Sequence, residues 1–210
     1  MLASGSAWSQ NAVSGLPAFG HKLSVCDSGE NTVLPGQLTF RQRACWYAND
    51  LVSPGLALHA GFSSALGQWH NDIYGKGQDG SDYAHRFGVF YARHSARDAA
   101  ELFAGYLNHE DPRPHLSGDT GLLRRTRAAL TSVVIANTDE GNRLSVAPIA
   151  GAVGSALVGS ALSREHDFTG RTFAREAVFS YSNSFAKALY QEFKPDISTL
   201  VRHALHKPTN

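Results

Sequence analysis

The densest group of chemically useful side chains is the segment 109–113, which reads HEDPR. An imidazole, two carboxylates and a guanidinium on a proline-stiffened turn are groups that bind a metal ion or act as general acid and base. The same groups also join helices, because Glu110 and Asp111 can accept hydrogen bonds from a helix N-terminus while Arg113 pairs with one carboxylate. We expect a structural clasp. If the protein is an enzyme, the catalytic candidates are His109, Glu110 and Asp111.

A second charged group follows one face of the helix expected over residues 83–108. Arg97 and Glu101 are four residues apart, as are His94 and Asp98, so each pair can meet on the helix surface. Two interpretations stay open, a solvated face with internal ion pairs or a polar cavity between helices. The candidate binding residues come from this helix, from the HEDPR segment and from the region after it. They are Arg93, Arg97, Asp98, Glu101, Arg113, Arg124 and Asp139.

Other catalytic and cofactor signatures are missing from the sequence. The ten histidines are scattered, and no HExxH, CxxC or GxSxG pattern occurs. The glycine-rich run 75–80 (GKGQDG) lacks the strand and the GK[ST] ending of a phosphate loop. Arg124 and its neighbours Arg125 and Arg127 fit phosphate head groups or, alternatively, a solvated turn. We therefore expect no metal and no cofactor; the alternative is a haem or metal carrier, which would need two histidines facing each other across a cavity.

The elements that must position these groups are helices. No run of residues alternates convincingly as a strand does, which predicts an all-α single domain of about five main helices. Thr39, Asp82, Ser145 and Thr169 are placed to begin helices, and a turn is expected over residues 138–142. The expected helices cover residues 39–47, 54–69, 83–108, 122–136, 145–163 and 169–194, the last ending before Pro195. The domain division is 1–37 as an extended lead-in, 38–197 as the helical domain and 198–210 as a tail.

Small residues recur at intervals of four in three of these helices. Residues four apart share one helix face, so each row predicts a close helix–helix crossing. Glycine inside a helix costs roughly 1 kcal/mol relative to alanine, so Gly151, Gly154 and Gly159 need a packing reason. The rows are Ala84, Gly88, Ala92, Ala96, Ala100 and Ala104; then Ala147, Gly151, Ser155, Gly159 and Ser163; and Ala57, Gly61 and Ala65.

Composition excludes several classes of protein. The chain has 210 residues, a formal net charge of +1, 42% hydrophobic and 18% charged residues, which is too apolar for disorder. The near-zero charge gives no field for nucleic acid, which is not expected as a partner. Residues 144–163 carry no charge and are long enough to cross a bilayer, but Gly, Ser and Ala weaken their hydrophobicity. A peripheral membrane contact is therefore favoured over a set of spans.

The beginning of the chain indicates export. Residues 1–10 (MLASGSAWSQ) resemble the end of a secretory signal peptide, although a cytosolic N-terminus is the alternative. Cys26 and Cys45 are the two cysteines, and in an exported chain they can pair and close a short loop. In the cytosol they would remain two thiols, and their spacing does not decide between these states.

Over residues 38–197 the chain resembles a family of uncharacterised exported bacterial helical proteins. Four motifs in the same order and spacing carry the resemblance: 86–88 (RFG) with Tyr91-Ala92, 109–113 (HEDPR), 138–141 (TDEG) and 192–197 (EFKPDI). The chain has Pro114 where the family usually has an aromatic residue, and Lys194 where it usually has Trp. The resemblance implies a signal peptide, a helical domain and an envelope location, but no reaction.

Two functional hypotheses follow. The first is an exported, non-enzymatic envelope protein, periplasmic or associated with the outer membrane. Its partner would be a membrane or lipid surface, a second copy of the chain or an envelope protein. The alternative is a hydrolase or lipid-modifying enzyme that uses His109, Glu110, Asp111 and Arg113. Convergence of these side chains in one cleft with Arg93, Arg97 or Asp139 would favour the enzyme, and bonds to helix ends would favour the structural clasp.

Overall fold

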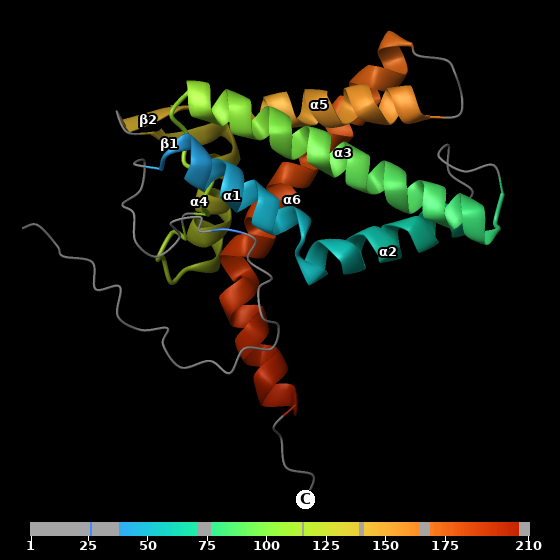
Figure 1. The fold of residues 1–210 in the computed structure, drawn as a ribbon. Coiled ribbons are helices and arrows are strands. Elements are labelled where there is room, and N and C mark those ends of the chain that lie inside the picture. The colour runs from blue at the N-terminus through green and yellow to red at the C-terminus, as the bar shows by residue number, and fades with distance from the viewer. Residues whose placement is uncertain are drawn as a thin grey trace, which may run out of the picture.

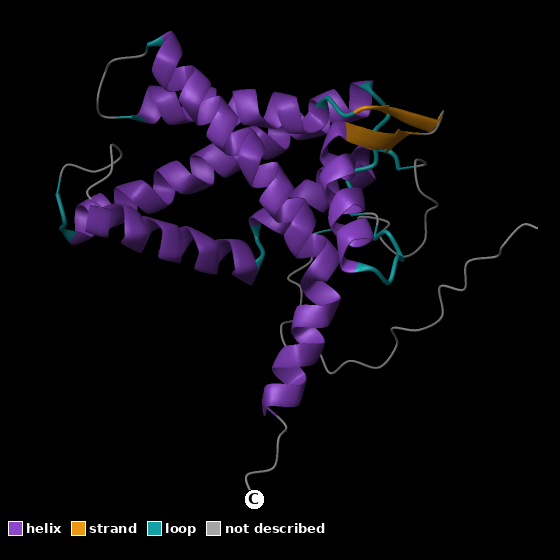
Figure 2. Cartoon of the chain, turned by 180° about the vertical axis from the view of Figure 1, so that it is seen from behind, coloured by secondary structure: helices purple, strands orange, loops and turns teal. Residues whose placement is uncertain are grey.

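The structure is a computed structural model that describes residues 26, 38–70, 77–114, 116–138, 141–163 and 169–205. The predicted helical fold class is confirmed, since six helices and one short hairpin make up the described part (Figures 1 and 2). In chain order the elements are α1 (Phe40–Leu51), α2 (Pro54–His70), α3 (Gly80–Leu107), α4 (Leu122–Val134), β1 (Ile135–Thr138), β2 (Gly141–Leu144), α5 (Ala147–Leu162) and α6 (Gly170–Leu205). The long helix α3 packs against α1, α2 and α5, and α6 packs against α4 and α5.

Local signals set the helix starts, with one correction. Thr39 caps α1 in a capping box with Gln42, as the sequence predicts. Helix α3, however, begins at Gly80 and not after Asp82. Its N-cap is Asp79, whose side chain accepts a hydrogen bond from the Asp82 backbone at 2.8 Å. The earlier aspartate satisfies the first free N–H groups, so the helix begins one turn sooner than expected.

The expectation of no strand is wrong at residues 135–144. The helix predicted to reach Ala136 ends at Val134, and β1 pairs with β2 as an antiparallel hairpin, Ile135 opposite Leu144 and Thr138 opposite Gly141. Ile135, the first residue of β1, is β-branched and favours extended backbone. Gly141 has a φ of +113°, which only glycine adopts easily. The middle of the turn expected over 138–142, residues 139 and 140, lies outside the described residues.

Helix α6 continues through Pro195, where the sequence analysis ended it. A proline inside a helix removes one backbone hydrogen bond, and tertiary contacts compensate on the α4 side. Arg125 of α4 donates to the Glu192 side chain at 3.0 Å, to the Glu192 carbonyl at 2.6 Å and to Asp196 at 2.6 Å. These bonds span the turn that contains the proline. The helix thus crosses the predicted domain boundary at 197 and ends at Leu205, with its last turns projecting from the body (Figure 1).

The Arg125 cluster also holds the segment before α4. Both oxygens of Glu192 accept hydrogen bonds from Ser117, at 2.7 Å from its hydroxyl and 3.1 Å from its backbone. Burial opposes ionisation of Glu192, but the Ser117 bonds and the Arg125 guanidinium outweigh it and hold its pKa below the usual range. Glu192 therefore stays charged and joins the 117 turn, α4 and α6.

A disulfide between Cys26 and Cys45 ties the N-terminal segment to α1. The side chain of Asn49, one turn further along α1, donates a hydrogen bond to the Cys26 carbonyl at 3.0 Å. Of the two states left open by the sequence, the paired one is present in the structure.

The predicted close crossing is present between α3 and α5. Gly151, Ser155 and Gly159 are buried, as are Ala152 and Ala156. A Cβ atom at Gly154 would lie 2.9 Å from the Ala96 carbonyl oxygen and 3.0 Å from the Ala100 Cβ atom. These glycines therefore let the two backbones approach closely. Among the described residues, no helix is both long enough and apolar enough to span a bilayer.

The first half of the α3 row does not take part in this crossing. Ala84 and Gly88 are exposed, and a Cβ atom at Gly88 would meet nothing within 4 Å. In α2, Ala57 and Ala65 are also exposed, and it is Ala60 and Ser64 that are buried. The reason is geometric, because successive residues four apart rotate by about 40° around the helix axis. A row of six positions therefore turns by about 200° and cannot face one neighbour throughout.

This geometry predicts opposite effects for two glycine-to-alanine substitutions. Gly154→Ala should lower the free energy of unfolding by about 1–3 kcal/mol, because the new methyl group meets the rigid backbone of α3. Gly88→Ala should raise it by up to about 1 kcal/mol, since it gains helix propensity in open space. Urea denaturation of both variants tests the prediction. Destabilisation of equal size at both positions would contradict the packing described here.

Candidate functional site

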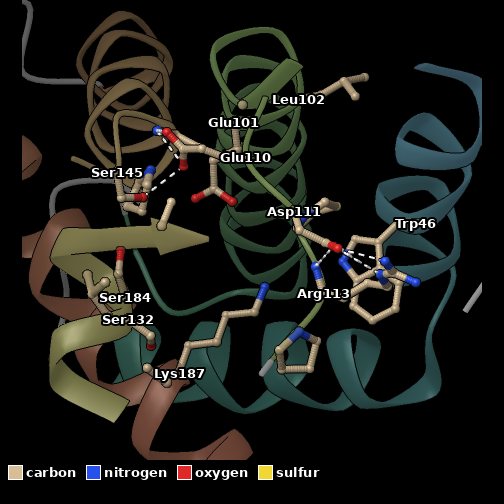
Figure 3. Close-up of a pocket in the computed structure, with 18 of the residues that line it drawn as sticks. Trp46, Glu101, Leu102, Glu110, Asp111, Arg113, Ser132, Ser145, Ser184 and Lys187 are labelled. Atoms are coloured by element: carbon tan, nitrogen blue, oxygen red, sulfur yellow. Dashed lines mark hydrogen bonds and ion pairs between the residues drawn. The ribbon is translucent and has the colours of Figure 1, made fainter. Parts of the chain in front are cut away.

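A cavity of about 200 Å³ lies between α1, α3, α6, β1 and the turn after α3. Figure 3 shows charged side chains from several of these elements facing it. Both signs of charge are represented in its lining, so it is suited to polar or ionic ligands rather than to an apolar one. The titratable residues of the lining are Arg43, Tyr47, Asp50, Arg97, Glu101, Tyr106, Glu110, Asp111, Arg113 and Lys187.

The turn that carries the HEDPR segment begins with a Schellman motif. The Glu110 N–H donates to the Gly105 carbonyl at 2.8 Å and the His109 N–H donates to the Tyr106 carbonyl at 3.2 Å. His109 takes the left-handed position of this motif, with a φ of +57°, where glycine is usual. Its side chain is consequently exposed and lies outside the cavity lining.

Glu110 is buried and caps the N-terminus of α5. Its carboxylate accepts hydrogen bonds from the Ser145 hydroxyl at 2.8 Å, the Val146 N–H at 2.6 Å and the Ala147 N–H at 3.3 Å. The Asn108 side chain adds a bond at 2.7 Å. This confirms that Glu110 accepts from a neighbouring helix N-terminus, where the helix dipole also favours negative charge. The helix expected from Ser145 therefore begins at Ala147, because Ser145 donates to Glu110.

Asp111 and Arg113 form the ion pair expected within the segment. Two guanidinium nitrogens meet the two carboxylate oxygens, Nε to Oδ1 at 2.9 Å and Nη2 to Oδ2 at 2.6 Å (Figure 3). The Asp111 side chain is fully buried. Its backbone N–H also donates to the Asn137 carbonyl of β1 at 3.3 Å. The pair thus fixes the path of the chain between α3 and the hairpin.

The charged face of α3 is an internal polar contact and not a solvated surface. Arg97 donates to Glu101 at 2.7 Å, to the Ser184 hydroxyl at 2.8 Å and to the Ser180 carbonyl of α6 at 3.2 Å. One turn earlier, Arg93 pairs with Glu176 of α6 at 2.5 Å. The internal ion pair of the first interpretation is present, but the stripe contacts α6 directly instead of facing solvent.

The glycines of α5 make room for these charges. A Cβ atom at Gly151 would lie 2.5 Å from the Glu101 Cγ atom, and one at Gly159 would lie 2.9 Å from the Arg93 Nε atom. The two most specific features of the sequence, the small-residue row and the charged stripe, therefore depend on each other. Charged side chains of α3 lie against the glycines of α5, and two of them, Arg93 and Arg97, extend to partners on α6.

A third polar group joins α1, α3 and α6. The His94 Nε2 atom lies 3.4 Å from Asp50 and 3.6 Å from Asp98, and the Lys187 ammonium lies 3.6 Å from Asp50. The hydrogen bond from His94 and the charge of Lys187 lower the pKa of Asp50 despite its partial burial. Burial raises the pKa of Asp98 to about 7. Burial also raises the pKa of Tyr47 above its ordinary range, with Glu101 and Asp98 adding to the effect.

The predicted site residues are only partly brought together. Arg97, Glu101, Glu110, Asp111 and Arg113 line the cavity, whereas Arg93 and Asp98 lie beside it on α3. Arg124 is exposed on α4, and its neighbour Arg125 makes the contacts to α6 instead. Asp139 lies outside the described residues.

Sequence reasoning missed Tyr47, Asp50 and Lys187. The first two belong to α1, which was predicted from the Thr39 cap and its apolar residues, and Lys187 belongs to α6 near the other end of the chain. A signal was present for Asp50, because it lies one turn beyond the aromatic pair Trp46 and Tyr47 on the same helix.

Comparisons with known proteins give no relative: no family model, no curated protein and no solved structure matches the chain. The resemblance to exported bacterial helical proteins therefore stays a prediction. Chemically, the arrangement engages Glu110, Asp111 and Arg113 in bonds that hold the fold.

If the HEDPR segment is a structural clasp, both members of the Asp111–Arg113 ion pair are needed for full stability. Asp111→Ala and Arg113→Ala should each lower the free energy of unfolding by about 1–3 kcal/mol, because each removes the two side-chain hydrogen bonds of the ion pair from a buried or largely buried charged partner. Equilibrium denaturation measures both, and exposed Arg124→Ala is the control. Unchanged stability in both pair variants, together with loss of a bound ligand, would instead identify the segment as an active site.

Proposed function

We propose that the protein is an exported, non-enzymatic protein of the bacterial envelope that binds a membrane surface peripherally through α2. The observation that carries the proposal is a row of large apolar side chains exposed on this helix, Leu58, Phe62, Leu66 and Trp69. Isolated apolar side chains are common on protein surfaces, but a contiguous row marks an interaction site.

The row forms one face of α2. At 100° per residue these four positions fall within an arc of about 80°, so their side chains share one direction. The face toward α3 is formed by Leu56, Ala60 and Ser64, which are buried. A hydrogen bond from the Tyr83 hydroxyl to a carbonyl of α2 anchors that side. Helix α2 therefore packs on α3 through this buried face, and the row of large apolar side chains faces outward.

The composition of α2 favours a membrane over a protein partner. Residues 54–70 contain no Asp, Glu, Lys or Arg, and the positions between the apolar residues hold Gly, Ala, Ser, His and Gln. A protein interface normally surrounds its apolar centre with a polar, hydrogen-bonding rim. Trp69 at the end of the row is a residue type that prefers the membrane interface. Insertion of each side chain is worth on the order of 1.5–3 kcal/mol.

The disulfide supports export. Disulfides persist in oxidising compartments such as the bacterial periplasm and are rare in the cytosol. The Cys26–Cys45 bond thus agrees with the signal-like beginning of the chain and with the resemblance to exported proteins. A periplasmic or outer-membrane-associated location follows from the same proposal.

The competing hypothesis of a hydrolase has less support. It requires a base with spare capacity in the cavity, whereas both oxygens of Glu110 accept hydrogen bonds from Ser145 and α5. His109 is exposed and outside the lining. Asp111 is engaged by Arg113 on both oxygens.

Vesicle flotation of the full chain tests the membrane proposal. The protein should float with vesicles of phosphatidylethanolamine and phosphatidylglycerol. Phe62→Ser should reduce the bound fraction severalfold, because an apolar side chain is lost from the inserted face. Phe179→Ser is the matched control, since Phe179 on α6 is 61% exposed and Phe62 is 65% exposed. The control should bind like the wild type.

Two results would contradict the proposal. One is the absence of vesicle binding by the wild type, which would leave a protein partner as the better occupant of this face. The other is an equal loss in the Phe62→Ser and Phe179→Ser variants, which would show that binding is not specific to α2.

A further inference from the structure

We infer that Asp50, His94 and Asp98 form a binding site for a divalent transition-metal ion, Zn²⁺ by preference, between α1 and α3. One nitrogen and two carboxylate oxygens from these residues lie within 4.8 Å of one another. The site is independent of the proposed membrane contact, which is on α2. It also differs from the sequence-based expectation, which found no metal pattern because the third ligand comes from another helix.

The long His94–Asp50 hydrogen bond and the His94–Asp98 contact also have the separations expected of two ligands of one metal ion. The His94 Nε2 atom is 3.4 Å from the Asp50 Oδ2 atom and 3.6 Å from the Asp98 Oδ2 atom. Ligand atoms about 2.1 Å from a tetrahedral Zn²⁺ lie about 3.4 Å apart. Both nitrogen–oxygen separations are close to this value, whereas a charge-assisted hydrogen bond would be about 2.8 Å long.

Asp98 supplies the independent observation that points to a ligand. Its side chain is 3% exposed, and neither of its oxygens has a hydrogen-bond partner among the described residues. A buried carboxylate without hydrogen bonds is costly, so such groups are normally paired or bound to a metal. One Asp98 oxygen lies within 4.8 Å of both the His94 nitrogen and the Asp50 oxygen, and a cation among these atoms would meet this need.

The neighbouring residues restrict the orientation of the His94 ring, and the cavity gives an ion access to the site. The imidazole ring lies parallel to the Phe90 ring one turn earlier, which restricts its orientation. Asp50 also lines the 200 Å³ cavity, so an ion can reach the site from there. One imidazole with two carboxylates suits Zn²⁺, while Mg²⁺ and Ca²⁺ prefer all-oxygen sites with more ligands.

Lys187 occupies the position of a competing cation. Its ammonium lies 3.6 Å from the Asp50 Oδ2 atom on the cavity side and is partly exposed. The long, flexible lysine side chain can leave when a metal binds. Replacing Lys187 with an uncharged residue should therefore tighten metal binding. If Asp50, His94 and Asp98 only share a hydrogen-bonded proton and bind no metal, this effect is not expected.

Isothermal titration of the EDTA-treated full chain with ZnCl₂ tests the inference. The wild type should bind one Zn²⁺, and Asp98→Asn and His94→Gln should each weaken binding by at least about tenfold, since even outer-sphere changes cost 10–100-fold. Lys187→Met should tighten it. Asp119→Asn and His203→Gln replace an exposed carboxylate and an exposed histidine elsewhere, and both should bind like the wild type.

Circular dichroism checks that each variant is folded. If Asp98→Asn does not fold, Asp50→Asn replaces it, because Asp50 is at the partly exposed edge of the site. Co²⁺ provides a second readout, since a tetrahedral site should give visible absorption bands that His94→Gln abolishes. Absence of binding by the wild type, or equal affinity in wild type and His94→Gln, would overturn the inference and leave His94 as a bridge between two carboxylates.

Discussion

The structure depends on the burial of a charged helix face. Arg93, Arg97 and Glu101 of α3 lie between α5 and α6, where they cannot be solvated as they would be on a surface. Buried charges are tolerated only with partners, and α6 provides these through Glu176, Ser184 and the Ser180 carbonyl. This requirement determines where α6 lies and explains why α5 has glycines opposite the charges.

The same principle determines the end of α3 and the beginning of α5. Glu110 is buried directly after α3 and satisfies the free N–H groups at the start of α5. The Asp111–Arg113 pair then leads the chain to β1. The cavity forms where these polar groups face one another, so its charged lining is a consequence of the fold. Beside it on α3, Asp98 is buried, and its side-chain oxygens have no hydrogen-bond partner among the described residues.

Local features of the fold were predictable from the sequence, whereas features set by distant residues were not. The Thr39 cap and the proline at the start of α2 act within one turn, so they are visible in the sequence. The continuation of α6 through Pro195 is not, because it relies on Arg125, about 70 residues away. The hairpin was missed since each of its strands has only four residues, too few to show alternation.

The candidate site divides in the same way. The roles of Glu110, Asp111 and Arg113 as a clasp followed from residue type and from the helix end beside them. The pair His94 and Asp98 was visible from its spacing of four. Asp50 of α1 and Lys187 of α6 complete that group. Their contact with it could not be predicted, because sequence periodicity relates residues within one helix and not residues of helices that meet only in the folded chain.

A double-mutant cycle on Arg93 and Glu176 tests the central claim most directly. These residues join α3 to α6 across 83 positions of the sequence. The free energies of unfolding of Arg93→Ala, Glu176→Ala and the double variant give the coupling energy between the two side chains. The account predicts a favourable coupling of at least about 1 kcal/mol, as expected of a part-buried pair in a shared network. A coupling near zero, typical of a surface ion pair, would contradict it.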